Sequence, residues 1–283
     1  LASGPRQQPA DLPLLSPTET NFKLEQAQRT HLRGKTVSCG SERQFALIQC
    51  EVERHQLHLQ SIDLLLRSRQ RLVSLENTSN SGFGTVWPLA TMQGVAKTAR
   101  GAGLSLHMDG ARLANACVKS GTKARDYAAC VDSLWLDYTK GLGAPVGASL
   151  AGSKEFIKEA WRHKQMMGGS MRQSGVIAAA ALYALEHNWD RLAEDHDNAR
   201  YLSEGIANIK GLEIDVPRME TNLVFFEVTK PGWTPARLVE ACKERGVGLG
   251  ANTATRIRAV THLDVNRADI DTALKAISDA LAA

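Results

Sequence analysis

The sequence lacks the features that identify a membrane protein or a nucleic-acid-binding protein. Its longest apolar run, residues 176–185, is too short to cross a bilayer and predicts a buried helix. Aromatic residues make up only 5% of the 283 residues, and the formal net charge of +4 is not gathered into a basic stripe. We therefore expect neither a membrane segment nor a nucleic-acid surface.

Cysteine pairs at metal-binding spacing are also missing. The five cysteines are odd in number and scattered, without a CxxC pattern. Reduced structural cysteines in a cytoplasmic protein are therefore expected, and no metal site. The first residues, beginning at Leu1, show no signal-peptide pattern, and a content of 43% hydrophobic and 23% charged residues predicts a globular chain.

From about Arg71 onward the sequence alternates strand and helix signals. A short apolar strand at residues 72–75 precedes a helix that begins at Pro88, and a second strand follows at residues 104–108. A strand–helix–strand unit predicts parallel strands joined by a right-handed crossover. The alternation continues with strands at 133–138 and 147–152, a helix at 154–167, and a helical region at 173–209 that breaks near Asn188.

The last quarter changes character. Segments at residues 212–216 and 223–228 alternate like strands of an antiparallel sheet, and helices are expected to begin after Thr234 and Asn266. We therefore predict an α/β fold, with a mostly parallel sheet domain and a smaller α+β domain. The predicted organisation is a divergent N-terminal segment at residues 1–70, an α/β core at 71–200 and a small C-terminal domain at 201–283.

Two residues that can support catalysis follow neighbouring predicted strands. Asp109 lies in LHMDGARLA and Lys140 in TKGLGAPVG. Ligands of open α/β sheets bind outside the carboxyl ends of parallel strands, so both side chains are expected at the same edge. A lysine can form a Schiff base and a carboxylate can hold a protonated pyridine nitrogen, which is the pairing that pyridoxal phosphate needs. Taken singly, Asp-Gly is also typical of a turn and Lys-Gly of a solvated loop.

Five collinear segments resemble one enzyme family. They are LENTSNSGFGTVWPL, LHMDGARLANA, TKGLGAPVGASLAGS, MMGGSMRQSGVIAAAALYAL and IRAVTHLDV. From Arg71 to the C-terminus the chain resembles the low-specificity L-threonine aldolases, which belong to the fold type I pyridoxal-phosphate enzymes. The resemblance implies a small-molecule substrate, pyridoxal 5'-phosphate as cofactor, and a homodimer or homotetramer.

The resemblance also implies roles for single residues. Lys140 matches the lysine that binds the cofactor aldehyde, and Asp109 matches the acid paired with the pyridine nitrogen. Arg112 matches an arginine that contacts the cofactor's phenolic oxygen and the substrate carboxylate. Arg258 matches the arginine of the smaller domain that binds the same carboxylate. Arg172 lies in a further family motif and is expected to shape the cofactor pocket or a subunit interface.

Two departures from the family pattern stand out. Ser79 occupies the position where the family commonly has a histidine, which is a candidate base for the substrate's β-hydroxyl, and serine has no comparable basicity near neutral pH. The family's phosphate-binding loop and ring-stacking residue are not evident in residues 1–70. A turn at residues 38–41 could hold a phosphate, and His55 and His58 could stack on the ring, but an ordinary loop and a helix surface are the favoured interpretations.

The expected function is cleavage of L-threonine, L-allo-threonine or a related β-hydroxy amino acid to glycine and an aldehyde. Two alternatives stay open: another fold type I lyase that catalyses β-elimination, and a degenerate homologue that acts as a binding or dimerisation module without turnover. Intact Lys140, Asp109, Arg112 and Arg258 favour the enzyme, whereas Ser79 and the altered N-terminal part favour the module.

Overall fold

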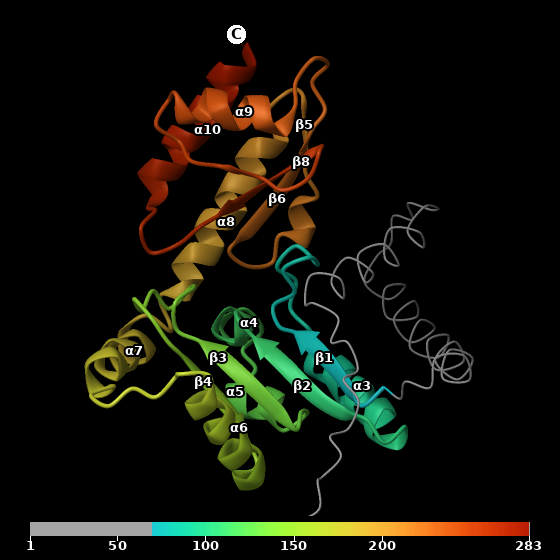
Figure 1. Ribbon diagram of the computed structural model, residues 1–283. Helices are drawn as coiled ribbons and strands as arrows, with labels where there is room; N and C mark the ends of the chain where they lie inside the picture. The colour runs from blue at the N-terminus through green and yellow to red at the C-terminus, as the bar shows by residue number, and fades with distance from the viewer. Residues whose placement is uncertain (1–69, 283) are drawn as a thin grey trace, which may run out of the picture. The chain divides into compact units, whose positions relative to one another are not determined.

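The computed structural model describes residues 70–282, which contain two four-stranded sheets (Figure 1). The first has the strand order β1-β2-β3-β4 and the second β5-β6-β8-β7. Within the described residues, none of the helices combines the length and apolar character that a membrane crossing needs. The strands of the first sheet are β1 (Leu72–Glu76), β2 (Ser105–Gly110), β3 (Ser133–Asp137) and β4 (Ala148–Gly152).

Strands β1, β2 and β3 are parallel, as the strand–helix–strand pattern predicts, and β4 is antiparallel to β3. The two faces of this sheet differ because side chains alternate along each strand. Leu106 and Met108 of β2 are fully buried in an apolar cluster with the helices α3 (Leu89–Gly101) and α5 (Ala124–Ala128). The opposite face carries polar residues, and there His107 Nδ1 lies 2.8 Å from Ser133 Oγ.

Helices begin where the sequence places their caps. Ser153 Oγ accepts the backbone N–H of Phe156 at 3.1 Å, and Thr234 Oγ1 accepts that of Arg237 at 3.2 Å. Asn266 and Asp269 exchange hydrogen bonds in a capping box. The remaining helices are α4 (Leu113–Ser120), α6 (Lys154–Met166), α7 (Gly175–His187), α8 (Leu192–Ala207), α9 (Pro235–Lys243) and α10 (Arg267–Ala282).

The second sheet is antiparallel and has one buried face. Its inner residues, among them Phe226 and Ile257, form an apolar cluster with α8, α9 and α10. The other face carries Phe225, Arg256 and Arg258. The strands are β5 (Leu212–Glu213), β6 (Leu223–Val228), β7 (Gly250–Ala251) and β8 (Arg256–Val260), with a 3₁₀ turn η1 (Val216–Arg218) between β5 and β6.

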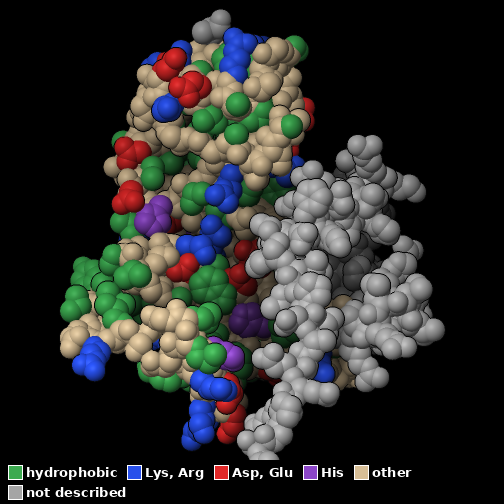
Figure 2. Space-filling model, in the orientation of Figure 1, with side chains coloured by type: hydrophobic (Ala, Val, Ile, Leu, Met, Phe, Trp, Pro, Cys, Tyr) green, Lys and Arg blue, Asp and Glu red, His purple; other side chains and the backbone are tan. Residues whose placement is uncertain are grey.

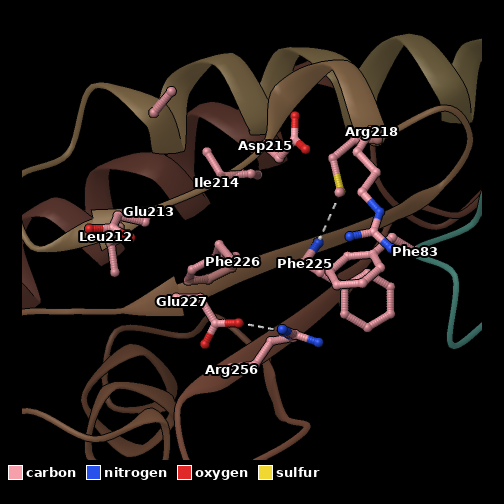
Figure 3. Close-up of a pocket in the computed structure, with 12 residues that line it drawn as sticks. Phe83, Leu212, Glu213, Ile214, Asp215, Arg218, Phe225, Phe226, Glu227 and Arg256 are labelled. Atoms are coloured by element: carbon pink, nitrogen blue, oxygen red, sulfur yellow. Dashed lines mark hydrogen bonds and ion pairs between the residues drawn. The ribbon is translucent and has the colours of Figure 1, made fainter. Parts of the chain in front are cut away.

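A turn at residues 79–85 contacts this second sheet through Phe83 (Figure 3). The Phe83 ring lies between two guanidinium groups, with Arg218 Cζ at 3.8 Å and Arg256 Cζ at 4.6 Å from its centroid, and packs edge-on against Phe225 at 4.8 Å. Phe83 has a φ of 72°, a left-handed conformation that costs on the order of 1–2 kcal/mol. Cation–π and aromatic contacts of about 0.5–1.5 kcal/mol each offset that cost.

Two predicted elements differ from the structure. The apolar run of α7 is not a buried helix among the described residues, since only Ala181 and Ala184 are buried and Val176 is 78% exposed. The stripe of α7 that carries Ala181 and Ala184 is packed, and no described element covers the rest of the helix. The strand predicted at residues 212–216 stops at Glu213, because Pro217, which cannot donate a ladder hydrogen bond, lies in the 3₁₀ turn. The helix expected at residues 42–69 lies outside the described residues.

Helix α8 carries two adjacent buried groups whose pKa values shift in opposite directions. Burial raises the pKa of Asp195 to about 6, although Arg191 forms an ion pair with it. Burial lowers the pKa of His196 to about 4, and Asn115 Nδ2 lies 3.1 Å from its Nε2, as expected for a neutral imidazole. These two groups join α8 to α4 and to the segment that follows β8, where Thr261 Oγ1 donates to the Asp195 carbonyl at 2.7 Å.

Substituting Gly110 tests the close approach of β2 and β3. A Cβ atom at Gly110 would lie 2.0 Å from the backbone oxygen of Trp135, so Gly110→Ala must push the strands apart. We expect a loss of about 2–3 kcal/mol or more in the free energy of unfolding, measured by urea denaturation. Gly94→Ala is the control, because Gly94 lies in α3 with open space around it, and it is expected to stabilise by about 0.5–1 kcal/mol. Equal effects of the two changes would contradict this account.

The paired shifts in α8 predict compensating pH effects on stability. Between about pH 4 and 6 the folded chain holds a proton on Asp195 that the unfolded chain releases, so this residue makes stability fall as pH rises. Over nearly the same range the unfolded chain holds a proton on His196 that the folded chain lacks, so this residue makes stability rise.

Removing one of these two residues should reveal the pH dependence of stability that the other causes. Asp195→Asn is expected to give stability that rises by roughly 2–3 kcal/mol from pH 4 to 6.5 relative to wild type, and His196→Gln is expected to give the reverse slope. Urea midpoints across this range provide the measurement. The same pH slope in both variants would show that these residues do not control it.

Candidate active site

Three carboxylates lie at the carboxyl ends of the three parallel strands. Glu76 ends β1, Asp109 lies next to the end of β2, and Asp137 ends β3. Glu76 is in register with Asp109, and Asp109 with Trp135, so these side chains point to one face of the sheet. Figure 2 shows basic and acidic side chains gathered on the visible surface between the two sheets. The sheet edge predicted for catalysis therefore carries an acidic cluster.

Lys140 lies at this edge, three residues after β3 ends. Its Nζ is 2.8 Å from Asp137 Oδ2 and 5.1 Å from the ring centroid of Trp135. Because Trp135 is in register with Asp109, Lys140 and Asp109 share one end and one face of the sheet, as the sequence predicts. The nearest acid to Lys140 is Asp137, which the sequence analysis did not assign, although its spacing of three residues from Lys140 could have indicated it.

Arg112 lies three residues after Asp109, at the N-cap of α4. Burial lowers the pKa of Arg112 and the positive charge of Arg258 lowers it further, whereas the carboxylates of the cluster act in the opposite direction. Its Nε is buried and has no hydrogen-bond partner among the described residues. A buried guanidinium N–H without an acceptor is costly, so this atom is suited to an acceptor supplied by a ligand.

Arg258 reaches the same region from the second sheet. It lies on β8, and its Nη1 donates to Asn80 Oδ1 at 3.1 Å. Asn80 in turn donates its backbone N–H to Glu76 Oε2 at 2.9 Å. The turn after β1 therefore connects the acidic cluster to Arg258, which the sequence alone could not show.

The loop that carries Lys140 contacts the segment that follows β8. His262 Nε2 lies 2.8 Å from the carbonyl oxygen of Lys140 and its Nδ1 lies 3.2 Å from Asp264 Oδ2. Gly143 has a φ of 71°, and a Cβ there would lie 2.1 Å from Leu263 Cδ2. The hydrogen bond of His262 holds the backbone of Lys140.

Two other predicted residues have less specific surroundings. Ser79 forms part of the turn after β1, where its Oγ accepts the N–H of Gly82 at 3.1 Å. Arg172 is exposed in the segment between α6 and α7. The predicted phosphate-binding turn at residues 38–41, together with His55 and His58, lies outside the described residues.

The described residues contain no group of three or more His, Cys, Asp or Glu side chains placed to hold a metal ion. A cavity of about 560 Å³ lies beside Phe83, lined by residues that include Arg218 and the ion pair Arg256–Glu227 (Figure 3). None of the predicted site residues lines this cavity. The predicted site is therefore the open sheet edge and not this cavity.

Comparisons with known proteins identify the family of the chain. The model of the family "Beta-eliminating lyase" matches residues 24–230. The low specificity L-threonine aldolase of Escherichia coli O157:H7 is 42% identical over 200 residues, which is 71% of this chain and 57% of that protein. The chain thus spans little more than half the length of this relative.

Solved structures show the same fold. A threonine aldolase from Leishmania major gives a TM-score of 0.60 at 20% identity, over 75% of this chain and 61% of that one. A PLP-dependent aminotransferase from Streptococcus suis 89-1591 gives 0.59 at 13% identity, over 79% and 60%. At such identities the likeness concerns the fold alone, which enzymes of different activity share. The predicted fold type I architecture is confirmed, and the chain belongs to the beta-eliminating lyase family.

Proposed function

We propose that this protein catalyses pyridoxal-phosphate-dependent cleavage of L-threonine, L-allo-threonine or a related β-hydroxy-α-amino acid to glycine and an aldehyde. The observation that carries the proposal is the placement of Lys140 and Asp109 on one face at the ends of adjacent parallel strands, with Arg112 and Arg258 beside them. The similarity to low-specificity L-threonine aldolases supports the same reaction.

The chemistry of these side chains fits the cofactor. The Lys140 side chain is 38% exposed and can reach an aldehyde, and Asp109 supplies a carboxylate for a pyridine nitrogen. The Nε of Arg112, which has no acceptor among residues 70–282, is a donor for a phenolic oxygen. When bound, pyridoxal phosphate supplies an electrophilic carbon and a ring that accepts the electron pair of a breaking Cα–Cβ bond.

The protein's own residues would bind and orient the substrate. Arg258, with help from Arg112, would hold the carboxylate by charged hydrogen bonds and so fix which bond at Cα stands across the ring plane. Asn80 positions Arg258 and links it to Glu76. Asp109 would hold a proton on the ring nitrogen and thereby stabilise negative charge that develops during cleavage.

Cleavage also requires an acceptor for the β-hydroxyl proton. Ser79 holds the position of the family's histidine, and its hydroxyl is bonded within the turn. A serine hydroxyl is not a base near neutral pH. We therefore assign this proton transfer to a water molecule or to a side chain other than Ser79.

The proposal predicts specific losses on substitution. Purified protein with added pyridoxal phosphate should show visible absorption of lysine-bound cofactor and should release acetaldehyde from L-threonine. Lys140→Ala should lose both, with turnover reduced at least about a thousandfold. Arg258→Lys should raise KM, because lysine cannot bind a carboxylate through two parallel hydrogen bonds. Lys158→Ala, on the exposed surface of α6, is the control and should behave as wild type.

Two outcomes would contradict aldol cleavage. Cofactor bound at Lys140 without aldehyde release from several β-hydroxy amino acids would favour a β-eliminating lyase. No Lys140-dependent binding of the cofactor would favour a binding or dimerisation module.

The domain division at residues 70/71 and 200/201 and a cytoplasmic location stay predictions. The division is supported by the two sheets, which share no strand, although α8 (Leu192–Ala207) crosses residue 200. The location is supported by Cys117, Cys130 and Cys242, which are free and buried, as structural cysteines in a reducing compartment are.

We also propose a homodimer or homotetramer. Exposed apolar side chains gather on β4, α6, α7 and the segment between the two helices, and Figure 2 shows such side chains over α7. This α6–α7 surface comprises Leu150, Phe156, Trp161, Met166, Met167, Met171, Val176, Leu182 and Tyr183. Contiguous apolar surface of this kind is typical of an interface.

A charge placed on this surface should weaken assembly. Met167 is 81% exposed, so Met167→Glu is expected to leave the subunit folded and to lower the oligomer mass measured by light scattering during gel filtration. Gln93→Glu, on the exposed side of α3, adds the same charge away from the surface and should change nothing. An unchanged mass for Met167→Glu, or a monomeric wild type, would exclude this interface.

A further inference from the structure

Asp137 is the acid in direct contact with the reacting nitrogen of Lys140. Its side chain is only 8% exposed, whereas that of Lys140 is 38% exposed. The pair therefore differs from the exposed ion pairs of this protein, such as Lys275–Asp279, whose side chains are 75% and 52% exposed. Water screens an exposed pair strongly and a pair with one buried member much less.

Two hydrogen bonds from Thr139 hold the carboxylate of Asp137 independently of Lys140. Its Oδ1 accepts the backbone N–H of Thr139 at 2.8 Å and the Thr139 hydroxyl at 2.6 Å, which leaves Oδ2 for Lys140. Burial alone would raise the pKa of Asp137, but the hydrogen bonds from Lys140 and Thr139 outweigh it and lower the pKa. The carboxylate is therefore ionised at neutral pH.

The other groups around Lys140 leave Asp137 as the acid that is paired with Nζ. The Trp135 ring beneath Nζ also favours a cation. Arg112 is close enough for Asp137, Asp109 and Glu76 to act on its pKa, and Arg258 lies beside Arg112. His262 contacts the backbone oxygen of Lys140. Among residues 70–282, Asp137 is the acid that forms an ion pair with Lys140.

We propose that Asp137 holds the ammonium form of Lys140 in an ion pair and so slows the reaction of Nζ as a free amine whenever that nitrogen is not covalently bound. The catalytic meaning of this role rests on the proposed function. If a substrate amine took the place of Lys140 on the carbon of bound pyridoxal phosphate, a bond to the substrate nitrogen would form and the bond to Nζ would break. Two protons would pass from the substrate ammonium nitrogen to Nζ, which would leave as an ammonium group paired with Asp137. Asp137 thereby favours the exchange that admits the substrate.

The reactivity of Lys140 toward formaldehyde tests this role without any cofactor. Only an unprotonated amine condenses with formaldehyde, and a borane then reduces the product to a methylated lysine that peptide mass spectrometry quantifies. In the full-length chain near pH 8, Asp137→Asn is expected to methylate Lys140 about tenfold faster than wild type, because a nearby opposite charge is removed. Asp137→Glu keeps the charge and should stay close to wild type.

Two further comparisons test whether faster methylation comes from the lost charge of Asp137, and not from easier access to Lys140 or from lower stability of the variant. Asp137→Ser is a second neutral variant and should also speed the methylation of Lys140. If one neutral variant fails to unfold cooperatively in urea, it is set aside and the other neutral variant provides the test. Asp279→Asn removes the acid of the exposed pair and should change methylation of Lys275 far less. An unchanged or slower reaction of Lys140 in a folded neutral variant would overturn the proposal.

This test is independent of turnover. Failure of the chain to cleave any β-hydroxy amino acid would remove the proposed function and leave the methylation result as it stands. A failed methylation test would remove the role of Asp137 and leave aldol cleavage unaffected.

Discussion

The site depends on the register of three parallel strands. Gly110 allows the backbone of β2 to approach the Trp135 carbonyl more closely than any side chain would permit. That approach aligns Glu76, Asp109 and Trp135 on one face and places Asp137 and Lys140 directly beyond them. Two later parts of the chain reach this edge, since Arg112 is the N-cap of α4 and the second sheet contributes Arg258.

Periodicity and capping made much of the fold predictable from the sequence. The strands at β1, β2 and β3 and the caps Ser153 and Asn266 are local signals, and the structure has each of them. The joint placement of Asp109 and Lys140 at one edge was also accessible, because it follows from a general rule for parallel sheets. Local pattern and one topological rule therefore sufficed to place these two residues at one edge of the sheet.

Contacts between distant segments were not accessible in the same way. Asn80 meets Arg258 across 178 positions and His262 meets the Lys140 backbone across 122, and no periodicity encodes such pairings. The prediction that the apolar run in α7 is buried was wrong for a related reason. Apolar sequence indicates burial, but it does not say whether the covering surface comes from the same stretch of chain. Asp137 is different, because its spacing of three residues from Lys140 is a local signal that could have indicated the ion pair.

The acidic cluster has a consequence for the anchor of a phosphate. Glu76, Asp109 and Asp137 face Arg112, Lys140 and Arg258, so the formal charges at this edge sum to zero. A phosphate monoester brings an additional charge of roughly −1.5 to −2 near neutral pH. These six residues offer no net positive charge to such a group, so we expect backbone N–H groups or residues outside the six to bind it. The described edge can grip a ring and a carboxylate, whereas holding the ester is a task for neighbouring structure.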